Sequence, residues 1–346
     1  MQLSPGKALY SNIVSKKKYI IVFLIIAIVI SFIVNLFVGS AGLTLVETIN
    51  AIFGDSSKIN RVIVWSIRMP VAISAILVGA ALGIGGCEMQ TILNNPMASP
   101  YTLGISSAAS FGAALVIILR ISISPFFDNI LISLSAFCFS ILASFSIFTL
   151  SKRFGWDRGV LILFGIAMSF LFNALTTFLQ FIADQNDLQS FIFWSFGDLT
   201  KINWTQILIL FIVLIVIYTL FFKKSWHLTA VTLGDSAALS LGIDVKKMRR
   251  TVIIMVAILS ATSVSFAGTI GFVGIVAPHI ARMIGGEDQR FLLSISALVG
   301  ALMLSVASTF GKTLVPGVIL PIGLVTSMVG IPFFIYLILQ HRGGMK

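Results

Sequence analysis

Long uncharged stretches alternate with short polar segments along the whole chain. Nine stretches contain no Asp, Glu, Lys or Arg, and eight of them run for 17 to 27 residues. A helix rises about 1.5 Å per residue, so about 20 apolar residues cross the roughly 30 Å hydrocarbon core of a membrane. The pattern therefore predicts an all-α, multi-pass membrane protein. The eight stretches are 19–38, 71–87, 103–119, 130–150, 159–183, 204–222, 291–311 and 313–339.

The ninth stretch, 251–281, has 31 residues, which is too long for one crossing and short for two. We interpret it as two spans joined by a tight turn around Ala267 and Gly268. The resulting count of ten keeps the tail of His341, Arg342 and Lys346 on the same side as the amino terminus. The sequence thus predicts ten transmembrane helices with both termini in the cytoplasm.

The basic residues are sorted to one side of these spans. With the amino terminus inside, the inner segments hold 17 of the 23 Lys and Arg residues, and the outer segments hold the other 6. Acidic residues show no such bias. Because Lys and Arg in short loops stay on the cytoplasmic side, this asymmetry indicates a protein of a prokaryotic inner or plasma membrane.

Composition agrees with a membrane protein and excludes several other classes. Hydrophobic residues make up 58% and charged residues 10%, and the mean hydropathy is +1.07. So few charges cannot cover a soluble surface of this size. The net charge of +11 borders apolar spans without interleaved aromatic residues, which argues against a nucleic-acid partner. Cys87 and Cys138 lie inside spans and belong to no CxxC or Cys/His cluster, so neither a disulfide nor a zinc site is indicated.

We expect one integral domain, 19–346, preceded by a mobile or interfacial cytoplasmic tail, 1–18. The stretch 19–38 follows three lysines, as a signal peptide would, but its 20 residues match a membrane crossing. We therefore interpret it as a retained first span. The outer loop after the fifth span is rich in aromatic residues, which predict an interfacial helix along the membrane. These residues are Phe191, Phe193, Trp194 and Phe196.

The largest inner insert, 223–250, carries the signals of a short helix. Asp235 or Ser236 can cap this helix, and Gly242 can end it in a left-handed turn. Two interpretations stay open at this point. The insert is either a capped loop held inside by its positive charge or a helix presented to a cytoplasmic partner.

A second segment breaks the helical pattern after the second span. Pro96 and Pro100 forbid a continuous helix, and non-helical backbone at membrane depth faces protein or water rather than lipid. Asn94 and Asn95 lie beside this break. The segment is either a plain inner turn or a constriction of a translocation path.

Candidate chemistry within the spans is sparse. Gly268, Gly271 and Gly274 are spaced three apart, which lets helices approach closely, and neither GKS/T nor GxGxxG is present. His279 follows Pro278 without an acidic neighbour in sequence, so we interpret it as structural rather than as a proton relay. We predict no catalytic, cofactor-binding or metal-ligating residue.

At these segments the chain resembles the FecCD family, the permease subunits of ATP-driven type II importers of iron-siderophores, haem and cobalamin. The matches run in family order over roughly residues 60 to 340. Together they are specific, although no single one is. They are Arg68-Met69-Pro70, Gly79-Ala80-Ala81-Leu82, Met89-Gln90, Asn95-Pro96-Met97-Ala98-Ser99-Pro100, Leu103-Gly104-Ile105-Ser106, Leu233-Gly234-Asp235, Leu241-Gly242, Gly271-Phe272-Val273-Gly274, Pro278-His279 and Leu320-Pro321-Ile322-Gly323.

The resemblance implies ten helices per subunit, a permease dimer enclosing the path, two ATPase subunits inside and a substrate-binding protein outside. It leaves open whether the second permease is an identical copy or a paralogue. It also implies that Asn95 and Met97, beside Asn94, occupy a cytoplasmic gate. The insert would couple to the ATPase through Leu233, Gly234, Asp235, Ser236, Ala237, Leu239, Leu241 and Gly242.

Arg68 and Lys312 match outer basic positions that receive acidic residues of the binding protein. Both fall on the outer side of the predicted topology, where cations are scarce. Without the resemblance, snorkelling at span ends explains them equally well. The chain departs from the family pattern at Val71, where a second Arg is common, at Lys312, where Arg is frequent, and at Ile319, where an acid often precedes Leu-Pro.

The sequence therefore predicts the permease of an ATP-driven importer of a ferric siderophore, with ATP and magnesium bound by a partner subunit. Haem or cobalamin are alternative substrates within the same class. An ion-gradient-driven transporter would need charged residues in mid-span, and only Glu88, near an inner span end, is a candidate. A membrane enzyme would need a metal cluster or an acid/base pair, and neither is found in the sequence.

Overall fold

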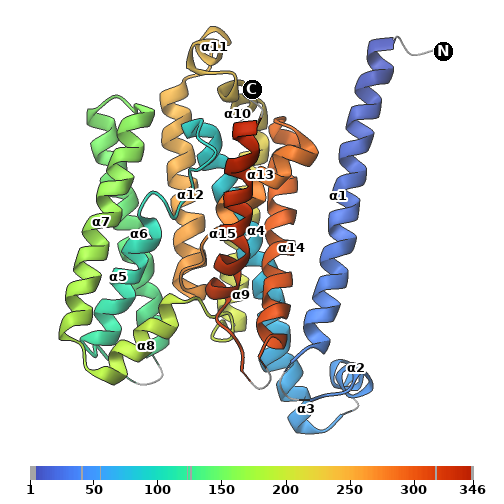
Figure 1. The fold of residues 1–346 in the computed structure, drawn as a ribbon, viewed down its shortest axis with the longest axis vertical. Helices are drawn as coiled ribbons and strands as arrows, with labels where there is room; N and C mark the ends of the chain where they lie inside the picture. The colour runs from blue at the N-terminus through green and yellow to red at the C-terminus, as the bar shows by residue number, and fades with distance from the viewer. Residues whose placement is uncertain are drawn as a thin grey trace.

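The computed structural model describes residues 5–39, 42–54, 56–122, 124, 127–315 and 318–343. These residues form α-helices and one π-helical segment, η1, and contain no β-strand (Figure 1). The helices are α1 (Pro5–Phe37), α2 (Leu45–Phe53), α3 (Lys58–Val62), η1 (Ile63–Arg68), α4 (Met69–Leu93), α5 (Ile105–Ile118), α6 (Asp128–Arg153), α7 (Arg158–Ile182), α8 (Gln185–Ser195), α9 (Trp204–Lys223), α10 (Ser225–Thr232), α11 (Asp235–Ser240), α12 (Val245–Ala267), α13 (Val273–Gly285), α14 (Gln289–Thr313) and α15 (Ile322–Gly343).

Seven described helical segments are long and apolar enough to cross a membrane. They include α1, α6, α7, α9, α12, α14 and the continuous run of α3, η1 and α4. Three shorter apolar segments are α5, α13 and the first part of α15. The all-helical membrane fold is confirmed, whereas the count of ten crossings stays a prediction. The 31-residue uncharged stretch is divided at the predicted turn, because α12 ends at Ala267.

Helix α4 lies at the centre of the bundle, between α12, α13 and α14 (Figure 1). Almost every residue from Pro70 to Leu93 is buried. Glycines bring the helix backbones into contact: a Cβ on Gly79 would lie 2.3 Å from the Gly300 carbonyl oxygen, and one on Gly86 would lie 1.7 Å from that of Gly274. The predicted close approach at Gly274 is thus confirmed, and the core is held by helix packing that only glycine permits.

Helices α5 to α8 form a second group beside this core (Figure 1). Phe191 and Trp194 of α8 are buried with Ala109 and Ala113 of α5. Phe193, in contrast, is 53% exposed. The outer loop does fold as a helix, but the expected membrane anchor is partly wrong, since two of its four aromatic side chains pack into the protein.

Helix α1 stands at the edge of the bundle and packs mainly on α14 (Figure 1). Ser31 and Ser305 share a hydrogen bond of 2.8 Å, and Asn35 Nδ2 donates to the Ser305 carbonyl at 3.1 Å. The helix extends back to Pro5, so residues 5–18 are helical and continuous with the first span. A domain boundary at residue 19 stays a prediction.

Candidate coupling helix, gate and outer basic pair

The predicted short helix of the inner insert is α11, and it projects beyond the ends of the neighbouring helices (Figure 1). It lies at the end of the molecule where α1 begins, which is the inner side of the predicted topology. Gly234 precedes it with φ of 104° and Gly242 follows it with φ of 77°, a region that favours glycine. The left-handed end at Gly242 is confirmed.

The predicted cap of this helix is wrong. Gly234 occupies the N-cap position, and no side chain caps the helix there. The Gly234 carbonyl accepts the first helical hydrogen bond from Ala238 N at 3.0 Å. Asp235 and Ser236 lie inside the first turn, and the Asp235 carboxylate bonds to other helices.

Apolar side chains cover the projecting surface of α11 and its flanks. Leu233 is 68% exposed, Leu239 60% and Leu241 65%. Ala238 is fully buried and attaches the helix to the bundle. A cluster of large apolar side chains beyond the span ends is typical of a surface that a partner protein covers.

Asp235 fastens α11 to two other helices. Its carboxylate accepts two hydrogen bonds from Arg249 Nη2 of α12, at 2.8 and 2.9 Å, and one from Arg158 Nη2 of α7. Partial burial raises the pKa of Asp235, but the hydrogen bonds and charges of Arg249 and Arg158 outweigh it and hold that pKa below its ordinary value. The carboxylate is therefore ionised at neutral pH, and its direct contacts are internal.

The predicted gate residues form a tight turn at the inner end of α4. Asn94 ends the helix with φ of 47°, and Asn95 Oδ1 accepts a hydrogen bond from Met97 N at 2.9 Å. Met97 is 51% exposed. The turn is bound back to α4 by the bond from Asn95 N to the Gln90 carbonyl at 3.2 Å.

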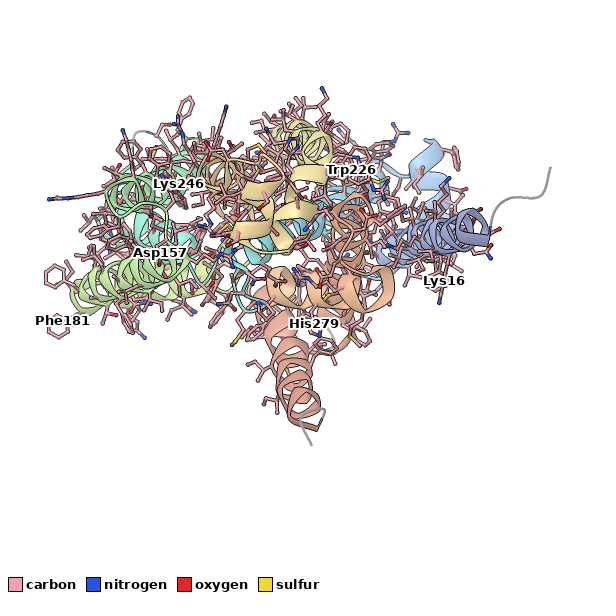
Figure 2. All side chains as sticks on the ribbon, turned by 90° about the horizontal axis from the view of Figure 1, so that it is seen from above. Lys16, Asp157, Phe181, Trp226, Lys246 and His279 are labelled. Carbon is pink, nitrogen blue, oxygen red and sulfur yellow. The ribbon has the colours of Figure 1, made fainter. Side chains whose placement is uncertain are left out.

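The gate turn and the coupling segment share one cleft of about 620 Å³ at the inner end. It is lined by Asn94, Asn95, Thr232, Leu233, His279 and Arg282, among others. Figure 2 looks onto this end and shows His279 on α13, between the core helices and α15. The cleft therefore brings together the gate turn and the coupling segment, which lie more than 130 residues apart in sequence. The sequence had predicted them as two separate features of the inner side.

The two predicted docking cations lie together at the outer end, but they turn inward. Arg68 is only 4% exposed, and its Nη1 donates to the Leu36 carbonyl at 2.9 Å. Lys312 Nζ donates to Asn35 Oδ1 at 2.6 Å and to the Asn35 carbonyl at 3.2 Å. A small cavity of about 90 Å³ is lined by both cations and by Val71 and Ile319, the positions that depart from the family pattern.

Arg249 is not among the residues predicted from the sequence. It is one of four basic residues at the start of α12, and their charge alone does not distinguish them. Lys246, Lys247 and Arg250 are exposed, whereas Arg249 is 4% exposed. A usable signal was present, because Arg249 shares the helical stripe of the buried residues Val245 and Val252.

No metal-binding cluster of His, Cys, Asp or Glu occurs within the part of the chain that the structure describes. Glu88 is fully buried in α4, and neither of its carboxylate oxygens has a hydrogen-bond partner among the described residues.

The described helices define a multi-pass membrane protein with candidate interaction sites at its two membrane faces. The chain belongs to the FecCD transport family, whose model matches residues 25–340. It is 39% identical to a putative ABC transporter permease protein of Methanocaldococcus jannaschii, over 94% of this chain and 96% of that one. It is 37% identical to the hemin transport system permease protein of Yersinia pestis, over 81% of this chain and 84% of that one.

A solved structure of a putative metal-chelate type ABC transporter, in an inward-facing conformation, has the same fold. Its TM-score is 0.82 at 27% identity, and the match covers 93% of this chain and 99% of the other. This protein is accordingly an ABC transporter permease, and its relatives also include a vitamin B12 import system permease protein of Pectobacterium atrosepticum, 32% identical over 82% of this chain and 84% of that one. Such permeases lie in the inner membrane of prokaryotic cells, and its relatives are transport subunits.

Proposed function

We propose that this chain is the permease through which an iron-siderophore enters the cell, driven by an ATPase that binds α11. The observation that carries the proposal is the projecting helix α11 with its flanks, which expose three leucines, Leu233, Leu239 and Leu241. These side chains lie outside the span ends, so lipid tails do not cover them. A protein groove removes them from water, and each buried leucine contributes roughly 1.5 to 3 kcal/mol.

The gate is the second part of the proposal. Asn94, Asn95 and Met97 stand in the turn at the inner end of α4. Asn94 and Asn95 share a cleft with Thr232 and Leu233 of the coupling segment. Movement of α11 by the ATPase therefore has a short route to the turn that closes the path. Polar amide side chains at this turn suit a large, polar chelate better than a bare ion.

Binding-protein docking at Arg68 and Lys312 is the third part. Both cations now donate to carbonyl oxygens at the end of α1, those of Leu36 and Asn35. Nη2 of Arg68 is buried and has no hydrogen-bond partner among the described residues. A carboxylate from the binding protein would compete with the α1 carbonyls for these donors. It would also accept a hydrogen bond from Arg68 Nη2. A second permease, identical or homologous, completes the assembly.

Iron-siderophore is the substrate that we propose within this importer type. The hemin permease and the metal-chelate transporter support a cargo in which an organic ligand holds a metal. Calorimetric titration of the cognate binding protein with ferric siderophores, hemin and cobalamin decides among them. Tight binding of hemin or cobalamin alone would reject the siderophore.

The competing function is a transporter driven by an ion gradient. It is favoured by Glu88, which is buried and whose carboxylate has no hydrogen-bond partner among the described residues. Reconstitution in vesicles separates the two. With the ATPase and binding protein present, ATP should drive accumulation of the chelate. Accumulation by the permease alone under an imposed ion gradient, without ATP, would contradict the proposal.

A further inference from the structure

Arg249 connects three separate segments at the inner end of the bundle. Its Nε donates to the Ile92 carbonyl of α4 at 3.2 Å, and its Nη1 donates to the Trp156 carbonyl between α6 and α7 at 2.9 Å. Its Nη2 donates to both carboxylate oxygens of Asp235 in α11, at 2.9 and 2.8 Å. One planar guanidinium thus holds the coupling helix, a loop and the end of the central helix.

The contact with α4 falls directly before the gate. Ile92 is fully buried and lies two residues before Asn94, where the helix ends. The backbone of Asn94 and Asn95 bonds to the Thr91 and Gln90 carbonyls of the same helical turn. A displacement of the Ile92 carbonyl therefore displaces the gate turn with it.

Burial makes this connection stiff. Arg249 is 4% exposed, so water does not substitute for a broken hydrogen bond. The three segments are bound by three different nitrogens of the guanidinium, Nε, Nη1 and Nη2. A lysine ammonium cannot reproduce this geometry. Separating Asp235 from Arg249 would also leave a buried cation without its carboxylate, which is strongly unfavourable.

We infer that Arg249 is a positioning residue that makes α11 and the gate turn at Asn94 and Asn95 move as one body. The inference rests on the proposed ATPase docking and adds the route by which docking reaches the gate. It assigns Arg249 no contact with substrate or ATPase. Its role is to keep the distance between coupling helix and gate constant while both change position.

Arg158 provides a matched control. It also donates to Asp235, from α7, but it makes no hydrogen bond to α4 among the described residues. Arg158→Gln removes one cation from Asp235 and leaves the link from Arg249 to Ile92 in place. Arg249→Gln removes both the cation and that link.

The experiment uses the assembled importer in vesicles and measures substrate transported per ATP hydrolysed. We expect Arg249→Gln to lower this ratio about tenfold, with ATPase association retained, and Arg158→Gln to change it less than about twofold. Equal losses in both variants, or an unchanged ratio in Arg249→Gln, would overturn the inference. Loss of ATPase association in Arg249→Gln would also overturn it, because Arg249 would then act through docking.

A distance measurement tests the rigid connection directly. Spin labels on Ser240→Cys and Met97→Cys, in a background with Cys87→Ala and Cys138→Ala, report the separation of α11 and the gate. The separation should stay constant between nucleotide-free and ATP-analogue-bound states of the wild type and change in Arg249→Gln. A wild-type separation that changes with nucleotide would refute the connection.

If Arg249→Gln fails to fold, Arg249→Lys serves as the second variant, because it keeps the positive charge. The lysine ammonium retains only one of the three connections, so we expect the same loss of coupling while insertion into the membrane stays normal. Full coupling in the lysine variant would contradict the inference. Failure of the proposed function looks different, because the wild-type permease would then bind no ATPase and its uptake would not depend on ATP.

Discussion

Lys312 and Asn35 join α14 to α1 at the outer end of the bundle, with Lys312 Nζ 2.6 Å from Asn35 Oδ1. The other end of the same amide donates to the Ser305 carbonyl at 3.1 Å and to Thr309 Oγ1 at 3.2 Å. One fully buried amide thus fixes the position of the peripheral helix and the direction of a predicted docking cation.

Replacing this amide should loosen α1. Asn35→Leu removes three side-chain hydrogen bonds between helices and leaves the Lys312 ammonium with the Asn35 carbonyl alone. We expect a loss of about 1 to 2 kcal/mol in the free energy of unfolding. Thermal unfolding in lipid nanodiscs measures it. Thr309→Val, which removes one of these bonds, should cost less, and equal losses would contradict the role given to Asn35.

Gly86→Ala tests the close contact between α4 and α13. The added Cβ would meet the backbone of Gly274, which cannot rotate away as a side chain would. The helices must separate, at a cost of about 1 to 3 kcal/mol. Gly271→Ala is the control, because nothing lies within 4 Å of its Cβ position. Unchanged thermal stability of Gly86→Ala would show that the contact is looser than described.

The exposed leucine of α11 should matter for partner binding alone. Leu239→Asn removes apolar surface without touching the buried side of the helix. We expect membrane insertion and thermal stability to stay normal while co-purification of the ATPase falls about tenfold. Ser240→Ala, on the neighbouring exposed position, should leave co-purification intact. Normal ATPase binding by Leu239→Asn would remove this leucine from the docking surface.

The attachment of α11 should resist acid to an unusual degree. Because the folded-state pKa of Asp235 lies below its ordinary value of 3.8, the attachment is present above that pH. It is lost only as the pH falls through the lowered pKa. Proteolysis of the insert by an acid-active protease should therefore accelerate only below about pH 3.8. In Asp235→Asn the rate of proteolysis should be high at every pH. A wild-type rate that rises already near pH 6 would contradict this account.

Docking of the binding protein should depend on Lys312 and on salt. Lys312→Gln removes one of the two predicted docking cations, and we expect association about tenfold slower at low ionic strength. The difference should shrink at high salt, because screening weakens the attraction in both proteins. Arg120→Gln is the control, since Arg120 is an outer cation already paired with Asp184 and Asp187. A salt-independent rate equal to that of the wild type would exclude Lys312 from docking.

The sequence predicted the features that depend on local chemistry. Gly268 marks the end of α12 because its φ of 72° is a conformation that glycine adopts readily, and Gly242 ends α11 for the same reason. The role of Asp235 could not be predicted in this way. Its partners lie 14 and 77 residues away, so a capping residue and an ion-pair residue look identical in the local sequence.

The outer cations illustrate the same limit. The predicted topology places Arg68 and Lys312 on one side, and the two side chains do line one cavity. Hydropathy, however, does not tell whether a cation at a span end faces water or protein. Their direction is set by the carbonyls at the end of α1, a helix that precedes Lys312 by more than 270 residues. Only the folded arrangement of three helices supplies that information.

The peripheral position of α1 has a consequence for biogenesis. Its main neighbour in this chain, α14, is synthesised much later: Ser31 and Ser305, which bond to each other, are 274 residues apart. At a translation rate of about 5 to 20 residues per second, the ribosome needs roughly 14 to 55 s to make that stretch. During this interval Ser31 and Asn35 sit in the bilayer without their final hydrogen-bond partners, and the polar contacts of α1 are completed only when α14 arrives.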